Sequence, residues 1–308
     1  MTAPTTPART PDPTPTPTPT PAPAPAPAPA PDLGRDGDRA RFRDLLACEW
    51  LKLWSLRSLV WALGLSALGL VAINANGALA DVNNWPTYPP ELQAHFVPDG
   101  ALGDAFTNNA GICLLLAAGC IGAATVAGEY STGMIRTGFA AVPARRSLMA
   151  AKLLVVTSVM LAWGVLVATL SFWLSQAILS ARDAGVPVTA PGALRTMVVS
   201  ALLAPVCALV GMGLAVLIRH AATSMVAAVG LLLLLPNLLT DNHHWEADLD
   251  HATVFRAWQQ LKDGTQHPLP GVDMGYRLWS DAGAWTDYAL WSALPVLLVL
   301  LVIRRRDL

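Results

Sequence analysis

A polar and basic interruption between two long apolar runs carries the residues best placed to do chemistry. It covers residues 128–152, GEYSTGMIRTGFAAVPARRSLMAAK. If the flanking runs cross a membrane, the excess of arginine and lysine places this segment on the cytoplasmic side. We interpret it as a docking surface for a cytoplasmic partner. Its basic residues are Arg136, Arg145, Arg146 and Lys152.

A short helix is predicted inside this segment. Ser131 or Thr132 can cap its start, since a hydroxyl oxygen accepts hydrogen bonds from the free N–H groups of a first turn. Pro143 would end it, because proline has no N–H to donate and its ring clashes with the preceding turn. The apolar edge of the helix would be formed by Met134, Ile135 and Phe139.

A second polar stretch, residues 240–284, holds side chains of metal-ligating type. Their spacing matches no zinc motif, so a solvated acidic loop outside the membrane is the simpler interpretation. The same stretch predicts a short amphipathic helix, residues 254–261, whose Val254, Phe255, Trp258 and Leu261 would rest on the outer headgroups. The metal-ligating types are His243, His244, Glu246, Asp248, Asp250 and His251.

The sequence holds no site for nucleotide hydrolysis. A P-loop places its lysine directly after a glycine, whereas Lys52, Lys152 and Lys262 follow Leu, Ala and Leu. Carriers driven by ion gradients usually keep ionisable residues inside their spans, and the central parts of the apolar runs hold none. We expect no catalytic residue, metal or cofactor in this chain, so any energy must enter from another polypeptide.

Composition sets the class of protein. The chain has 308 residues, of which 54% are hydrophobic and only 13% charged, against about 25% charged residues in a soluble domain. We predict an all-α polytopic membrane protein with no role in nucleic-acid binding. Its six apolar runs, each near the roughly 20 residues that a span needs, are residues 59–79, 110–127, 153–179, 196–218, 221–239 and 288–303.

Charge placement predicts the orientation of these spans. Basic residues precede the first span, fill the segment 128–152, mark a tight hairpin at Arg219 and His220, and close the chain at residues 304–306. The connections on the other side are mainly acidic. The positive-inside rule therefore predicts that both termini are cytoplasmic, which agrees with an even number of spans.

The region before the first span divides into a tail and a helix. Residues 1–40 alternate proline with Thr and Ala, which favours a disordered, polyproline-like cytoplasmic tail. Residues 41–58 predict an interfacial helix, with Trp50 and Trp54 at the headgroups. Glu49 lies on its apolar side, where we expect either a basic partner such as an arginine of the segment 128–152, or contact with water.

Small residues and cysteines are expected to serve packing. Small residues four apart permit close approach of helices in a membrane, and Pro205, Pro236 and Pro295 can kink their spans. Cys48, Cys113, Cys120 and Cys207 are interpreted as small buried apolar residues and not as a disulfide or metal set. The small pairs are Ala118 with Gly122, Gly119 with Ala123, and Gly211 with Ala215.

Two stretches, EWLKLWSLRS at residues 49–58 and the segment 128–152, resemble the permease subunits of actinobacterial ABC transporters in the type-two exporter superfamily. The resemblance covers about residues 41–308, the six-span domain. The residues that carry it most specifically are Glu129, Tyr130, Gly133, Ile135, Arg136, Pro143, Arg145, Arg146 and Lys152.

The resemblance implies an exporter permease in a bacterial plasma membrane, paired with a second permease chain that is identical or related. Residues 133–141 would be the coupling helix, which docks on a separately encoded ATPase that uses ATP and Mg²⁺. Gly138 would lie inside this helix, where glycine lowers helix stability by about 1 kcal/mol relative to alanine. Ile135 and Phe139 would be docking knobs, Arg136 a polar contact and Glu129 an anchor. Thr132 joins this docking set. The resemblance also makes residues 41–58 the connecting helix, which would contribute Glu49, Trp50, Lys52 and Arg57.

Two other functions stay open. A regulatory or scaffold membrane protein could share this fold and bind an ATPase without moving a substrate. A membrane-bound enzyme could use the external histidines and acids, in which case metal content and the loss of activity after replacing His243 and His251 would reveal it. The sequence does not identify the transported substrate.

Overall fold

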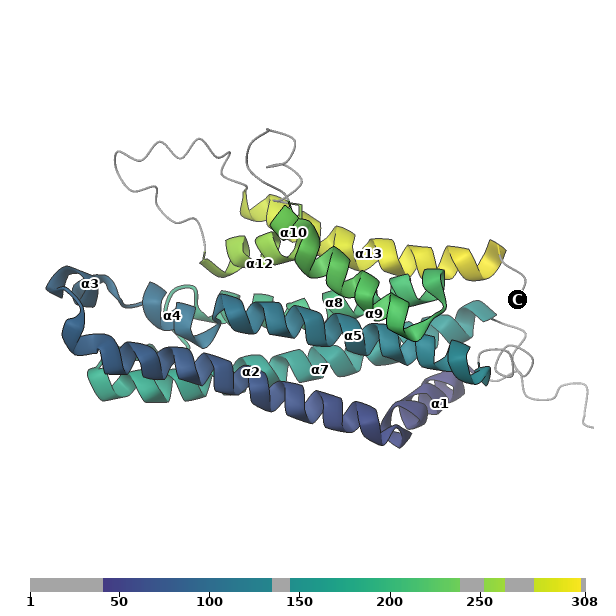
Figure 1. Cartoon of the computed structure of the whole chain (residues 1–308), viewed down its shortest axis with the longest axis horizontal. Coiled ribbons are helices and arrows are strands. Elements are labelled where there is room, and N and C mark those ends of the chain that lie inside the picture. The colour runs from purple at the N-terminus through teal and green to yellow at the C-terminus, as the bar shows by residue number, and fades with distance from the viewer. Residues whose placement is uncertain (1–40, 135–144, 239–251, 264–279, 306–308) are drawn as a thin grey trace, which may run out of the picture. The chain divides into compact units, whose positions relative to one another are not determined.

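The computed structural model describes residues 41–134, 145–238, 252–263 and 280–305, and within these ranges the chain forms helices joined by turns (Figure 1). In chain order the α-helices are α1 (Phe42–Ser55), α2 (Arg57–Asn84), α3 (Pro90–His95), α4 (Asp99–Ala105), α5 (Asn108–Thr132), α7 (Arg145–Leu179), α8 (Ala193–Ile218), α9 (Ala221–Val229), α10 (Leu235–Leu238), α12 (Val254–Asp263) and α13 (Asp281–Arg305). The described chain also has three short helical turns. They are the 3₁₀ turns η1 (Trp85–Thr87) and η2 (Ser180–Arg182) and the π-helical turn η3 (Gly230–Leu234).

Six stretches of the described chain are long and apolar enough to cross a membrane, which confirms the all-α, six-span prediction. By helix length and hydropathy the chain is therefore a multi-pass membrane protein. The end of α13 lies at the same end of the bundle as α1 (Figure 1). The six stretches are Arg57–Thr87, Asp99–Thr132, Arg146–Arg182, Ala193–Ile218, Ala221–Leu238 and Asp281–Val302.

The last span begins earlier than predicted. The sequence favoured a short run from Tyr288, whereas α13 starts at Asp281. The hydroxyl of Ser280 accepts a hydrogen bond from the backbone N–H of Gly283 at 3.1 Å, and the Asp281 carboxylate lies in the first turn, where the helix dipole favours negative charge. Polar capping residues thus extend this helix beyond its apolar run.

The predicted helix over residues 41–58 is instead two helices. The first, α1, ends at Ser55, and Leu56 is extended with φ −84° and ψ 93°. The Ser55 hydroxyl donates to the Lys52 carbonyl oxygen at 2.8 Å, which supplies a partner at the end of the helix. As a result Arg57 belongs to α2 and not to the helix that carries Glu49.

Helix α8 is the centre of the bundle and packs against α5 and α7 with backbones in close contact. A Cβ atom added at Gly211 would overlap the Gly119 carbonyl oxygen, and one at Gly122 would overlap the Ala208 carbonyl oxygen. Gly164 of α7 makes the same kind of contact with α8. Since helices in lipid gain little from apolar burial, these close approaches are a main source of their association.

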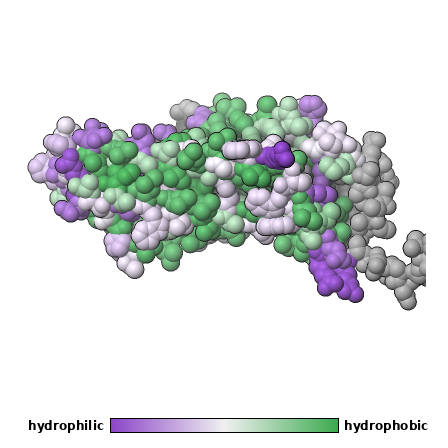
Figure 2. Space-filling view, turned by 90° about the horizontal axis from the view of Figure 1, so that it is seen from below, coloured by the Kyte–Doolittle hydropathy of each residue, from purple (hydrophilic) through white to green (hydrophobic). Residues whose placement is uncertain are grey.

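The outer helices expose apolar side chains to their surroundings. Leu65 and Leu68 of α2 are 61% and 69% exposed, Val226 of α9 is 70% exposed, and α13 adds a row of exposed leucines. Figure 2 shows hydrophobic residues over most of the middle of one face, with hydrophilic residues gathered towards its two ends. Such a surface suits a bilayer, where lipid chains cover it.

The three prolines are accommodated in two ways. Helices α8 and α13 continue through Pro205 and Pro295. Ahead of Pro236 the chain forms the π-helical turn η3, in which the Leu235 N–H bonds to the Gly230 carbonyl five residues back. A π turn is one of the known ways in which a helix absorbs a local irregularity.

The prediction that all four cysteines are buried is wrong for two of them. Cys207 is buried in α8 and Cys120 is half-buried, but Cys48 and Cys113 are exposed. Cys113 faces outward from a membrane-spanning helix, where a weakly polar thiol is compatible with lipid. The thiols form no disulfide.

The helix predicted over residues 254–261 is present as α12, but its predicted position on the headgroups is wrong. Its apolar face packs into the bundle against α8, α13 and α5. Trp258 is 2% exposed, its ring lies against Gly111, and its indole N–H donates to the Ser200 hydroxyl at 3.1 Å. Glycine leaves room for the ring, and the serine satisfies the N–H that a buried tryptophan must pair.

Tyr88, just beyond the span that contains α2, gives a testable prediction of ionisation. Its hydroxyl donates to the Asp81 carboxylate at 2.7 Å, and this hydrogen bond, with burial and the nearby charge, raises the pKa of Tyr88 to about 12. A phenol is neutral when protonated, so this contribution to stability is present below the unfolded pKa of about 10 and is lost as pH rises towards 12.

Replacing Asp81 by asparagine should therefore return the Tyr88 phenol to a pKa near 10. Ultraviolet absorbance titration of wild type and variant, each corrected with a Tyr88→Phe background, measures it. Identical Tyr88 titrations in the two proteins would show that the carboxylate does not hold this proton.

Candidate functional site

Four charged side chains meet where α1 packs against the start of α7, beside the last turn of α5. The ammonium group of Lys152 contacts one carboxylate oxygen of Glu49 and lies 2.8 Å from Glu129. The ammonium group of Lys52 lies 2.7 Å from Glu49 and 3.3 Å from Glu129. We call these four residues the charge cluster. Two positive and two negative groups balance, so the cluster has no net charge.

Burial differs within the charge cluster. The side chain of Glu49 is 2% exposed and that of Lys152 is 6% exposed, while Glu129 is 12% and Lys52 is 32% exposed. A buried ion is expensive to remove from water and persists only when it is paired. The Glu49–Lys152 pair is therefore the core of the cluster, and Lys52 closes it on the solvent side.

Burial lowers the pKa of Lys52, but its hydrogen bond with Glu49 and the charges of Glu129 and Glu49 raise it by more. The net effect is a pKa above the ordinary value of 10.5, so Lys52 is charged at neutral pH. Its contribution to stability is present below the unfolded pKa and is lost only as pH rises through the raised value.

The helical repeat of α1 explains why Glu49 points inward. Leu45, Glu49 and Leu53 are four residues apart, lie on one face and are the buried residues of this helix. That face packs against α7. The opposite face exposes Trp50 and Trp54, whose rings are 5.6 Å apart in an edge-to-face arrangement. A carboxylate in an otherwise apolar buried stripe thus requires a cation from the neighbouring helix.

The charge cluster joins both ends of the segment between α5 and α7. Glu129 lies in the last turn of α5, and Lys152 lies two turns into α7. Gly133 caps α5 with φ 73°, a left-handed conformation that favours glycine, and its N–H bonds to the Tyr130 carbonyl at 3.3 Å. The two ends of this segment are consequently held together and tied to α1.

The predicted hairpin at Arg219 and His220 is present and joins the same end of the bundle. Arg219 ends α8 with φ 60°, and the His220 ring nitrogen accepts from the Thr223 N–H to cap α9. The Arg219 guanidinium lies 5.5 Å from the centre of the Tyr130 ring, a cation–π contact. Tyr130 therefore links the end of α5 to this hairpin.

The structure places the predicted docking residues unequally. Glu129, Tyr130 and Lys152 are brought together with α1 and the hairpin, whereas Thr132 is exposed and bonds back to the Gly128 carbonyl. Arg145 begins α7, and Arg146 is exposed in its first turn. Ile135, Arg136, Phe139 and Pro143 lie outside the described residues, as does most of the predicted coupling helix.

One detail of the predicted segment is wrong. Ser131 and Thr132 are the last residues of α5 and do not cap a following helix, because both hydroxyls donate to the carbonyl oxygen of Gly128 at 2.9 Å. Gly133 is the C-terminal cap of α5, and the next residue, Met134, is again helical. The rest of the predicted coupling helix lies outside the described residues, so that prediction is untested.

The expected basic partner of Glu49 is present, but it is a lysine and not an arginine. Lys152 comes from the predicted docking segment, 103 residues along the chain. Sequence reasoning missed that Lys52 would turn towards Glu49 from the same helix. The signal was the three-residue spacing of these opposite charges, which permits contact on one side of a helix.

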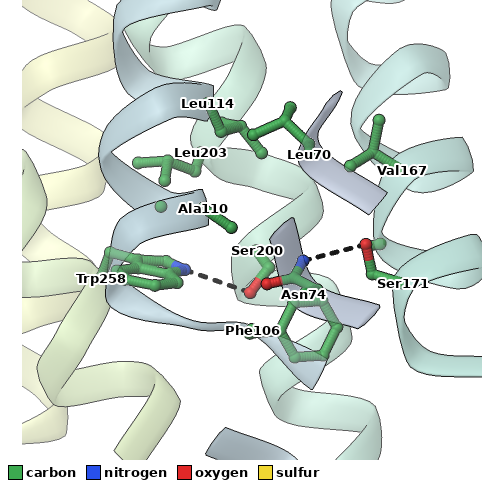
Figure 3. Close-up of a pocket in the computed structure, with 12 residues that line it drawn as sticks. Leu70, Asn74, Phe106, Ala110, Leu114, Val167, Ser171, Ser200, Leu203 and Trp258 are labelled. Atoms are coloured by element: carbon green, nitrogen blue, oxygen red, sulfur yellow. Dashed lines mark hydrogen bonds between the residues drawn. The ribbon is translucent and has the colours of Figure 1, made fainter. Parts of the chain in front are cut away.

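A small pocket with a mainly apolar lining and a few polar groups lies nearer the other end of the bundle, between α2, α5, α7, α8 and α12 (Figure 3). The Asn74 amide donates to the Ser171 hydroxyl at 3.0 Å, and its oxygen accepts from the N–H and hydroxyl of Thr107. The cavity is about 20 Å³, enough for a single water molecule. It is too small for a substrate, so its polar groups act here as links between helices.

The described ranges contain no group of three or more metal-ligating side chains. The external cluster proposed from the sequence, His243 to His251, lies outside those ranges, so that interpretation is untested.

Comparison with models of protein families gave no match to this chain, and comparison with curated proteins gave none either.

Proposed function

We propose that this chain is the membrane-spanning permease subunit of an ATP-driven ABC transporter, working as an exporter in a bacterial plasma membrane with both termini in the cytoplasm. A separately encoded ATPase would hydrolyse ATP with Mg²⁺, and a second permease chain would complete the pathway. The observation that carries the proposal is the charge cluster, which fastens the ends of the basic segment 128–152 to α1.

This arrangement would allow the segment 128–152 to pass a movement of the ATPase on to the membrane helices. A push on the segment would reach α1, α5 and α7 together, because the cluster joins all three. Helices α5 and α7 both contact α8 with close backbone approach, so the push would continue into the centre of the bundle. Rigid packed helices pass on small displacements of this kind as discrete rearrangements of the bundle.

The proposal also accounts for what the sequence lacks. The chain has no P-loop, and the charge cluster is neutral and already paired, so it offers no free group for proton transfer. The excess of basic residues in the segment 128–152 is instead suited to a protein partner and to the inner side of the membrane.

Affinity purification from native membranes in mild detergent tests the proposal. The wild-type chain should carry a P-loop ATPase with it, and the Ile135→Asp, Arg136→Glu double variant should lose it. A matched control, Leu92→Asp with Arg182→Glu, makes the same change of charge at an exposed leucine and an exposed arginine of the opposite end and should retain the ATPase.

Absence of any ATPase, under conditions that preserve other membrane complexes, would contradict the proposal and favour a scaffold role. An ATPase that stays with the docking variant would place the contact elsewhere. If the ATPase binds but no substrate stimulates its turnover, the chain regulates or anchors the ATPase and does not transport.

A further inference from the structure

A hollow of about 510 Å³ lies at the α1 end of the bundle, between α1, α7 and α13. Most of its lining is apolar, namely Phe42, Ala150, Leu297, Leu300 and Leu301. Its polar part is the first turn of α7, with Arg146 and Ser147.

The hollow crosses the boundary between lipid and water. The apolar stretch of α7 begins at Arg146, and the leucines of α13 lie inside the last span, which ends at Val302. The hollow has an apolar floor and a cation at its rim. This arrangement is complementary to a phospholipid, because the floor can contact the acyl chains while the cation contacts the phosphate.

Unlike the nearby lysines, Arg146 has a side chain that can bind an anion from outside the protein. Lys52 and Lys152 are paired within the charge cluster, whereas Arg146 is exposed and makes no ion pair with a described residue. A guanidinium binds phosphate well because its planar donors can contact two oxygens at once.

A larger apolar groove lies between α8, η3 and α13. It measures about 750 Å³ and shares Leu297 and Leu301 with the hollow. These two leucines are 55% and 51% exposed and form a ridge that both spaces border. The groove has an apolar lining throughout, which suits a hydrocarbon chain and no polar ligand.

We propose that this surface binds an anionic phospholipid, with its phosphate at Arg146, one acyl chain on the leucines of the hollow, and the second chain across the ridge in the larger groove. Basic pockets between membrane helices on the cytoplasmic side favour anionic headgroups. The inference depends on the cytoplasmic orientation of the α1 end and not on the transport function.

Native mass spectrometry tests it on the full chain, reconstituted in nanodiscs with equal amounts of phosphatidylcholine and phosphatidylglycerol. The wild type should retain phosphatidylglycerol in preference to phosphatidylcholine. The Arg146→Gln variant should lose about fivefold of that preference, the effect of one basic residue near a membrane surface. The matched variant Arg182→Gln, an exposed arginine at the opposite end of the bundle, should behave as wild type.

A second variant tests the apolar part of the surface. Ala150→Phe fills the hollow and should reduce retention of both lipids there while leaving Arg146 in place. Equal lipid preference in wild type and Arg146→Gln would overturn the proposal, as would retention unchanged by Ala150→Phe. A dimer that excludes lipid from this face would assign the surface to a second copy of the chain.

Discussion

Replacing Lys152 by methionine is expected to lower the free energy of unfolding by about 3–5 kcal/mol, the usual effect of removing one partner from a buried ion pair. The variant leaves Glu49 at 2% exposure with its nearest cation gone. Lys52 can neutralise only one of the two remaining carboxylates, so the cluster would carry a net negative charge in a region poor in water.

Two further variants separate charge from packing. Lys52→Met removes a cation that is 32% exposed and should cost no more than about 1 kcal/mol, as expected for pairs near solvent. The double variant Glu49→Gln, Lys152→Met leaves Glu129 with Lys52, a neutral remainder, and should be more stable than Lys152→Met alone. Unfolding in mixed micelles, followed by tryptophan fluorescence, measures all three. If Lys152→Met lowers the free energy of unfolding by less than about 1 kcal/mol, the Glu49–Lys152 pair behaves like a solvent-exposed ion pair. That result would contradict the account of the cluster.

Replacing Gly122 by alanine is expected to destabilise the protein by about 1–3 kcal/mol, the typical effect of overpacking a tight contact. The new Cβ would overlap the Ala208 carbonyl oxygen, which belongs to the backbone of α8 and cannot rotate away as a side chain could. The two helices must separate, and the contacts of α5 with the centre of the bundle weaken.

Gly128 provides the matched control because it lies on the same helix, and an added Cβ would meet nothing within 4 Å. Gly128→Ala should be neutral or stabilising by up to about 1 kcal/mol, since alanine restricts the unfolded chain more than glycine does. The same unfolding measurement compares them. Equal stabilities of the two variants would show that α5 and α8 can move apart without lowering the free energy of unfolding.

The fold could be predicted wherever the determining signal was local. The membrane spans follow from runs of apolar residues, and the hairpin at Arg219 follows from a brief polar interruption between two of them. The small residues at Gly122 and Gly211 also predicted close helix approach, because only a small side chain permits it. None of these inferences needed to know which helices are neighbours.

The inferences that failed depended on contacts between distant parts of the chain. The apolar face of α12 has the same pattern whether it meets lipid or protein, and Trp258 proved to be buried against Gly111. Cys113 lies in an apolar run, but which side of α5 it faces is decided by α8. The partner of Glu49 lies 103 residues away, so its identity became visible only when α1 was placed against α7.

The most direct test of the central claim is capture of the ATPase by charge-exchanged variants. The claim is that the Glu49–Lys152 pair holds the docking segment in position for its partner. Lys152→Glu should abolish capture, because its new carboxylate would join those of Glu49 and Glu129 in the charge cluster. Adding Glu49→Lys restores two charges of each sign and should recover much of the capture. Undiminished capture by Lys152→Glu, or a stable double variant that captures no ATPase, would contradict the claim.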